Sequence, residues 1–246
     1  MPAMGRPQRV DTGGIIYHAL NRANARLPMF DSDGDYAAML RIIAEAQEKV
    51  PMRVIEYALM PNHWHLVLWP RADGDLAEFM RWLTVAHTQR WHAAHGTAGT
   101  GHVYQGRYKM FPVQARRVSL AGRRQGVLDK GSSIWAVLRY VERNALRAGL
   151  VARAEQWRWG SLWRRTQGDA NQRAMLSDPP GAWPADWVEC VNRPQTAEEE
   201  QALAICIARG RPFGTPDWVA SAAAKLGLQI TLRPRGRPRK SPEKGS

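Results

Sequence analysis

The sequence predicts an α+β protein built on one antiparallel sheet. Short apolar runs of strand length alternate with longer segments whose apolar residues recur at helical spacing. In chain order these segments are strand, helix, strand, strand, helix, strand and helix. A Pro-Asn turn separates the second and third strands, so we expect these two to form a hairpin. This order favours a sheet with its helices packed on one face.

Each predicted element has a local reason. Runs rich in β-branched and aromatic residues predict strands at 15–21, 52–60, 63–69 and within 103–115. Apolar residues at helical spacing predict helices at 36–50, from 75 to about 95, and at 134–147. Ser32 or Asp33 can cap the first helix, and Gly149 can end the third. The order strand, helix, strand, strand, helix, strand predicts the ferredoxin-like arrangement.

Composition divides the chain into four parts. Residues 1–165 contain the whole predicted sheet and are expected to form one domain. Residues 166–196 are rich in Pro, Asp and Trp and have weak periodicity, so we interpret them as a linker. Two short helices in 197–232 predict a small helical DNA-binding region. Residues 233–246 form a basic tail, which we expect to be disordered.

Charge and cysteine content narrow the class of function. The chain has 35 Lys and Arg against 22 Asp and Glu, a net charge of +13. Such a charge favours a polyanionic partner, and the alternative is a merely basic surface. Two cysteines make neither a disulfide framework nor a zinc knuckle. We find no apolar signal segment or membrane-spanning run, so we expect a cytoplasmic, nucleoid-associated protein with no membrane partner.

The third strand begins with His63-Trp64-His65. Alternate residues of a strand point to the same face, so both histidines project together and Trp64 points the other way. Two neutral imidazoles on one face can bind one cation. Two histidines at this spacing are by themselves a weak signal for a metal site. The alternative is that the two rings simply pack against their neighbours.

The third predicted helix offers further candidates. Tyr140 and Asn144 are four residues apart and therefore lie on one helix face. Asn144 has a carbonyl oxygen of the type that Mg²⁺ and Mn²⁺ prefer. Tyr140 has a phenol that can attack phosphorus if it is activated. Spacing alone favours a half-buried core role for Tyr140.

Several stretches together resemble one family. They are YHALNRAN (17–24), YALMPNHWHLVLWP (57–70), GHVYQGRYKMFPV (101–113), RYVERNALRAGLV (139–151) and the C-terminal RGRPFGTPDWV with its basic tail. In order and spacing they resemble the REP-associated tyrosine transposases, which belong to the single-tyrosine branch of the HUH nucleases. These are related to insertion-sequence transposases that act on single-stranded DNA.

The resemblance implies a role for each candidate. It implies that His63, His65 and Asn144 bind a divalent cation, Mg²⁺ or Mn²⁺, and that Tyr140 is the nucleophile. The implied reaction is cleavage and transfer of a DNA strand through a 5′-phosphotyrosine intermediate. Two features depart from the family pattern: an apparent insertion at 116–131, and Ala145 where relatives commonly have proline.

The implied partner is single-stranded DNA carrying a REP-type hairpin, bound by a monomer or a homodimer. Between residues 101 and 167 there are 14 Lys and Arg against 3 Asp and Glu, interleaved with aromatic residues, as suits single-stranded nucleic acid. The predicted DNA contacts are Arg107, Arg139, Arg143, Arg147, Arg235, Arg237, Arg239 and Lys240. The alternatives are a catalytically inactive, domesticated DNA-binding protein and an RNA-processing metalloenzyme.

Overall fold

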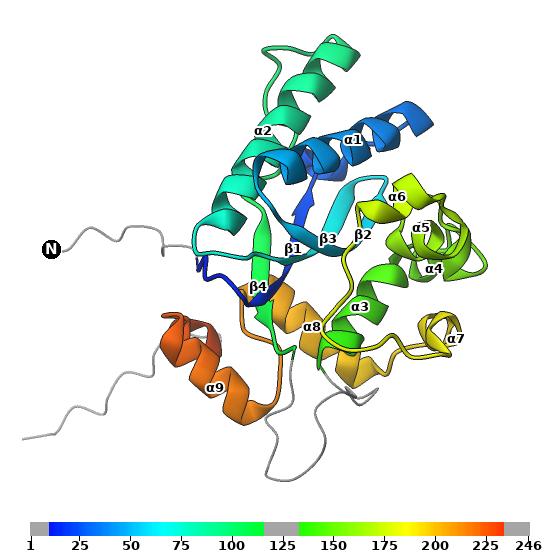
Figure 1. Cartoon of the computed structure of the whole chain (residues 1–246). Coiled ribbons are helices and arrows are strands. Elements are labelled where there is room, and N and C mark those ends of the chain that lie inside the picture. The colour runs from blue at the N-terminus through cyan, green and yellow to red at the C-terminus, as the bar shows by residue number, and fades with distance from the viewer. Residues whose placement is uncertain (1–9, 116–132, 234–246) are drawn as a thin grey trace, which may run out of the picture.

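The computed structural model of the chain describes residues 10–115 and 133–233. Its centre is one antiparallel sheet in the order β2-β3-β1-β4 (Figure 1). The strands are β1 (Ile16–Arg22), β2 (Arg53–Met60), β3 (His63–Trp69) and β4 (Lys109–Val113). The helix α1 (Asp33–Lys49) connects β1 to β2, and α2 (Asp75–His95) connects β3 to β4. The predicted α+β class and ferredoxin-like order are confirmed.

Local sequence signals account for these elements. Ser32 caps α1 through a capping box with Asp35, each side chain binding the other's main-chain N–H. The Pro61-Asn62 turn brings Met60 opposite His63, which fixes the register of the β2–β3 hairpin. Gly96 ends α2 in the left-handed conformation that glycine adopts without strain.

Helices cover both faces of the sheet, where packing on one face was predicted. On one face, α1 and α2 bury Tyr17, Trp64 and Leu66. On the other face, α3 (Ser133–Glu142) packs over Val67 and Phe111. Along β2 and β3, consecutive residues are buried, so both faces of these strands are covered. Each face therefore needs a layer of helices.

Most of the C-terminal part of the chain packs on the α3 side of the sheet (Figure 1), while Trp159 joins the core on the α1 side. Its helices are α4 (Asn144–Arg147), α5 (Ser161–Gln167), α6 (Ala170–Ala174), α7 (Trp187–Asn192), α8 (Ala197–Arg209) and α9 (Pro216–Lys225), with short 3₁₀ turns at Ala154–Gln156 and Gln229–Leu232. A further 3₁₀ turn, Asn24–Arg26, follows β1. The predicted linker contains α6 and α7, and Trp187 of α7 is buried against α3. Leu203 of α8 joins the same core, and Phe213 adds main-chain hydrogen bonds to the edge of β4.

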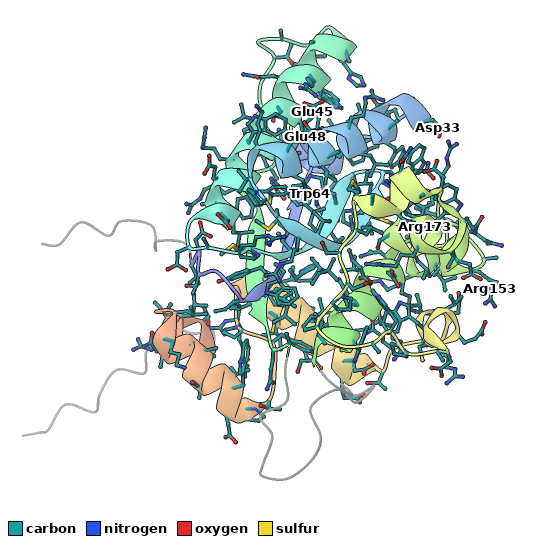
Figure 2. All side chains as sticks on the ribbon, viewed as in Figure 1. Asp33, Glu45, Glu48, Trp64, Arg153 and Arg173 are labelled. Atoms are coloured by element: carbon teal, nitrogen blue, oxygen red, sulfur yellow. The ribbon has the colours of Figure 1, made fainter. Side chains whose placement is uncertain are left out.

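Many charged side chains lie at the surface, although Glu56 and Glu142 are buried. Asp33, Glu48 and Arg153 are exposed at the periphery, whereas Trp64 lies between the layers (Figure 2). Within the ranges that the structure describes, no helix combines the length and apolar character needed to cross a membrane. The predicted insertion at 116–131 and the tail beyond Arg233 lie outside the described residues.

Candidate functional site

The two histidines of β3 face α3. Trp64 between them is fully buried on the α1 and α2 side, so the alternation of the strand separates the indole from both imidazoles. The ring centroids of His63 and His65 are 5.1 Å apart. His65 is buried, and His63 is half-buried at the start of the strand.

Tyr140 and Asn144 lie over these histidines. The Tyr140 ring centroid is 5.9 Å from that of His65, and the Asn144 side chain lies close enough to His63 to act on the pKa of its imidazole. Asn144 is buried and begins α4, which continues the direction of α3 with only a local irregularity at Arg143. Ala145 occupies a fully buried position there. The structure therefore brings all four predicted residues of the site together.

A third histidine belongs to the same cluster. His18 of β1 is fully buried, and its Nε2 lies 2.8 Å from Nδ1 of His65. Its own Nδ1 has no hydrogen-bond partner within the described residues. The sequence analysis did not identify His18. His18 lies near His65 because Leu20, two residues further along β1, is paired with His65 in the sheet. This pairing cannot be read from the sequence.

The buried histidines are neutral near pH 7. Burial lowers the pKa of His18 to about 3. Burial, together with the charges of Arg22 and Arg147, lowers the pKa of His63 to about 4. Burial also holds the pKa of His65 well below its ordinary value. Neutral imidazole has the free lone pair that a metal ligand requires.

The donor atoms of the cluster fit a divalent cation. Nδ1 of His63 lies 2.7 Å from Oδ1 of Asn62, and an amide oxygen only accepts, so the His63 proton is on Nδ1 and its Nε2 has a lone pair. Asn144 adds an amide whose buried Nδ2 has no hydrogen-bond partner among the described residues. No group of three His, Cys, Asp or Glu suited to a metal occurs in the described part of the chain. Two imidazoles and one amide oxygen are suitable ligands for Mn²⁺.

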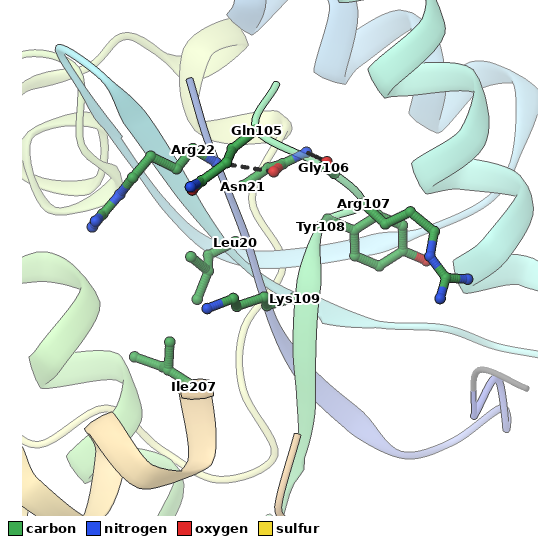
Figure 3. A pocket seen from close by; sticks show the side chains of 9 residues that line it. All are labelled: Leu20, Asn21, Arg22, Gln105, Gly106, Arg107, Tyr108, Lys109 and Ile207. Carbon is green, nitrogen blue, oxygen red and sulfur yellow. Dashed lines mark hydrogen bonds between the residues drawn. The ribbon is translucent and has the colours of Figure 1, made fainter. Parts of the chain in front are cut away.

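A basic pocket adjoins the histidines. It has a volume of about 580 Å³, and Figure 3 shows Asn21 and Arg22 of β1 on one side, Arg107 on the other, and the Lys109 side chain extending from β4 toward Leu20. Arg22 lies directly opposite His63 in the sheet, so the pocket begins beside the candidate metal ligands. A hydrogen bond from Asn21 Nδ2 to the Gly106 carbonyl holds the two sides together. Arg22 and Lys109 were not predicted as site residues.

The predicted DNA-contacting residues have different surroundings. Arg107 lines the pocket. The guanidinium groups of Arg139 and Arg143 donate hydrogen bonds to main-chain carbonyls of residues 191–194, so these two side chains tie α3 to the α7–α8 segment. Arg147 lies over the Tyr140 ring, 4.3 Å from Cζ to the ring centroid. The four tail residues Arg235, Arg237, Arg239 and Lys240 lie outside the described residues.

One protein-family model matches part of the chain. Residues 12–123 match the model of the family described as "Transposase IS200 like". This range includes β1 to β4 with His63 and His65 and ends before Tyr140. A search of curated protein sequences gave no match.

Two solved structures are similar to the chain. One is a REP-associated tyrosine transposase bound to a REP hairpin, with a TM-score of 0.50 and 16% sequence identity over 79% of this chain and 96% of that chain. The other is a candidate transposase from Deinococcus radiodurans R1, with a TM-score of 0.35 and 18% identity over 44% of this chain and 82% of that chain. The first similarity supports the fold described above.

Proposed function

We propose that the chain cleaves and rejoins single-stranded DNA beside REP-type hairpins, with Tyr140 as the nucleophile, because residues 12–123 match the model of the IS200-like transposase family. The observation that carries this proposal is the contact between the tyrosine helix and the histidines of β3. Tyr140 is next to His65, and the Asn144 side chain lies close enough to His63 to act on its pKa. The family match ends before Tyr140, so the role of this helix is argued from geometry.

The proposed chemistry is covalent catalysis. The Tyr140 oxygen attacks the scissile phosphorus, the bond from phosphorus to the 3′-oxygen breaks, and the strand end remains attached as a 5′-phosphotyrosine. The phenol proton leaves and the departing 3′-oxygen gains a proton, so the step is balanced. The phosphodiester is exchanged without loss of its bond energy, and a second 3′-hydroxyl can reverse the step and join strands.

His63, His65 and Asn144 would hold the divalent cation, Mg²⁺ or Mn²⁺. A cation bound there supplies Lewis-acid stabilisation of charge on the phosphate oxygens. His18 supports this arrangement because its Nε2 can accept a hydrogen bond from Nδ1 of His65, which leaves Nε2 of His65 as the ligand atom. His18 is therefore a positioning residue.

The pocket beside His63 suits the DNA strand. Arg22, Arg107 and Lys109 supply positive charge for phosphates, and Asn21 and Gln105 supply hydrogen-bonding groups. We assign to this pocket the single-stranded segment next to the cleaved bond. The choice of a REP-type hairpin as the recognised element rests on the resemblance of most of the chain to REP-associated transposases.

The test is the covalent adduct. A labelled single-stranded DNA with a REP-type hairpin is incubated with the protein and Mn²⁺, and SDS-stable protein–DNA adducts are separated by electrophoresis. We expect an adduct with the unmodified protein and none with Tyr140→Phe. Tyr36→Phe is a matched control, since it removes a phenol oxygen from α1 on the opposite face of the sheet, and it should give the unmodified yield.

Two outcomes would contradict the proposal. An equal adduct in Tyr140→Phe would exclude Tyr140 as the nucleophile. Binding of the hairpin with no adduct under any divalent cation would favour the alternative of a DNA-binding protein without catalysis. In the same assay, His63→Ala should lose the adduct and keep hairpin binding, because His63 is only half-buried and is assigned to the cation.

A further inference from the structure

We infer that Arg147 competes with the divalent cation for the Asn144 oxygen, and that a bound cation displaces Arg147 from the arrangement in which it is hydrogen-bonded to Asn144. In this arrangement Arg147 positions both the nucleophile and the ligand oxygen. The inference rests on the proposed function, because it assigns Asn144 to the cation and Tyr140 to the attack. It adds a residue that couples the two.

The contacts of Arg147 carry the inference. Its Nη2 donates a hydrogen bond of 3.1 Å to Oδ1 of Asn144, the atom assigned to the cation. Its Cζ lies 4.3 Å from the centroid of the Tyr140 ring, a cation–π distance. One guanidinium therefore touches the candidate nucleophile and the candidate ligand at once.

The charge of Arg147 explains why the two cations exclude each other. Arg147 is close enough to His63 and His65 to act on both imidazoles through its charge. A divalent cation between these imidazoles would share the Asn144 oxygen with a guanidinium and be repelled by it. Cation binding must therefore break the hydrogen bond between Arg147 and Asn144.

A second partner is available to Arg147 after the displacement. Nη1 of Arg147 lies 3.9 Å from Oε1 of Glu200, in the first turn of α8. The guanidinium can move toward this carboxylate and keep its charge paired while it remains near Tyr140. The neighbouring Arg139 and Arg143 have no such freedom, since main-chain carbonyls hold their guanidinium groups.

The experiment measures Mn²⁺ binding without DNA. Isothermal titration of the full chain is compared for the unmodified protein, Arg147→Met and Arg147→Lys. Methionine keeps the aliphatic stem and removes both the charge and the hydrogen-bond donors. We expect Arg147→Met to bind Mn²⁺ about tenfold more tightly, because a charge-assisted hydrogen bond no longer competes for Asn144. The adduct yield should fall several-fold, because the Tyr140 ring loses its stacking partner.

In Arg147→Met, Mn²⁺ affinity should rise while the adduct yield falls, and this distinguishes the proposed role of Arg147 from a purely structural one. A residue that only stabilised the fold would lower Mn²⁺ affinity and adduct yield together. Arg147→Lys keeps the charge without the planar fork, and its Mn²⁺ affinity should lie between those of the other two proteins. Arg81→Ala removes one positive charge from an exposed position of α2 and should leave Mn²⁺ affinity unchanged.

Different results would overturn the displacement of Arg147 and the proposed function. Unchanged or weaker Mn²⁺ binding in Arg147→Met, with the protein folded by its circular dichroism, overturns the displacement even if the unmodified protein forms adducts. An unmodified protein that forms no adduct overturns the proposed function, while tighter Mn²⁺ binding by Arg147→Met would still support the displacement. If neither protein binds Mn²⁺ at millimolar concentration, the displacement is overturned, because no cation takes the Asn144 oxygen.

Discussion

The two faces of the sheet bury different chemistry. The face under α1 and α2 buries Tyr17 and Leu66, and its main polar contact is satisfied: Trp64 Nε1 donates to the Tyr104 hydroxyl, which also contacts His87 Nδ1. The face under α3 buries polar side chains among apolar ones. Within the described residues, Nδ1 of His18 and both carboxyl oxygens of Glu56 have no hydrogen-bond partner.

This difference shows how one sheet serves two purposes. Buried polar groups without partners cost free energy, so they persist where another requirement holds them in place. All of the candidate site lies on the costly face, and the opposite face supplies the compensating apolar burial. Stability and function should therefore respond to substitutions on opposite sides of the same strand.

Trp64→Ala should have the largest effect. The side chain is fully buried, so its removal leaves a cavity and should lower the free energy of unfolding by about 3–5 kcal/mol. Urea denaturation followed by circular dichroism measures this loss. His63→Ala, one residue earlier and half-buried on the other face, should cost less than about 1 kcal/mol. Equal losses would show that the two faces do not differ as described.

Glu56→Gln should have a smaller effect of opposite sign. Glu56 of β2 is buried beside Glu142 of α3, which accepts a hydrogen bond of 2.7 Å from Trp187. Burial, and then the charge of Glu142, raise the pKa of Glu56 well above 4.5; burial raises that of Glu142 to about 7, while Arg165 opposes both shifts. Because the pKa of these carboxyl groups is raised in the folded state, their contribution to stability is fully present below pH 4.5. This contribution is lost as the pH rises through about 7, the pKa of Glu142.

The measurement is the free energy of unfolding from pH 5 to pH 8. Relative to the unmodified protein, Glu56→Gln should become progressively more stable as the pH rises across this range, and the comparison cancels the contribution of the buried histidines, which both proteins share. Glu45→Gln is the control, because Glu45 is bound to Arg90 on the surface and its pKa is lowered. The interpretation is wrong if the slope with pH is the same in Glu56→Gln and the unmodified protein.

The sequence predicted those features that depend on neighbours along the chain. The hairpin between β2 and β3, the capping of α1 by Ser32 and the ferredoxin-like order follow from local patterns, and the structure contains them. The resemblance to IS200-like transposases is confirmed by the family match. Alternation along β3 also separated Trp64 from His63 and His65 correctly.

Features that depend on distant pairing were not predictable. His18 joins the site only because β1 lies beside β3, a pairing between residues 47 positions apart. The side of the sheet that α3 covers depends on the path of the chain. Arg139 and Arg143 are of the residue type that contacts DNA phosphates. Their guanidinium groups instead donate hydrogen bonds to carbonyls of the segment interpreted as a linker. Periodicity carries no information on such contacts.

His18→Leu should have the smallest effect on free energy and the most selective one. Leucine fills the buried volume but cannot accept a hydrogen bond from His65, so the His65 ring loses the contact that fixes its tautomer. Mn²⁺ affinity measured by titration should fall about tenfold, which corresponds to about 1.4 kcal/mol.

The same substitution should leave the fold intact, since it removes a buried Nδ1 that has no partner in the described structure. The free energy of unfolding of His18→Leu should stay within about 1 kcal/mol of the unmodified value, unlike that of Trp64→Ala. His18→Gln returns an amide oxygen as an acceptor and should recover part of the Mn²⁺ affinity. Loss of stability in His18→Leu with unchanged Mn²⁺ binding would make His18 a packing residue, and the face under α3 would then resemble the opposite face at this position.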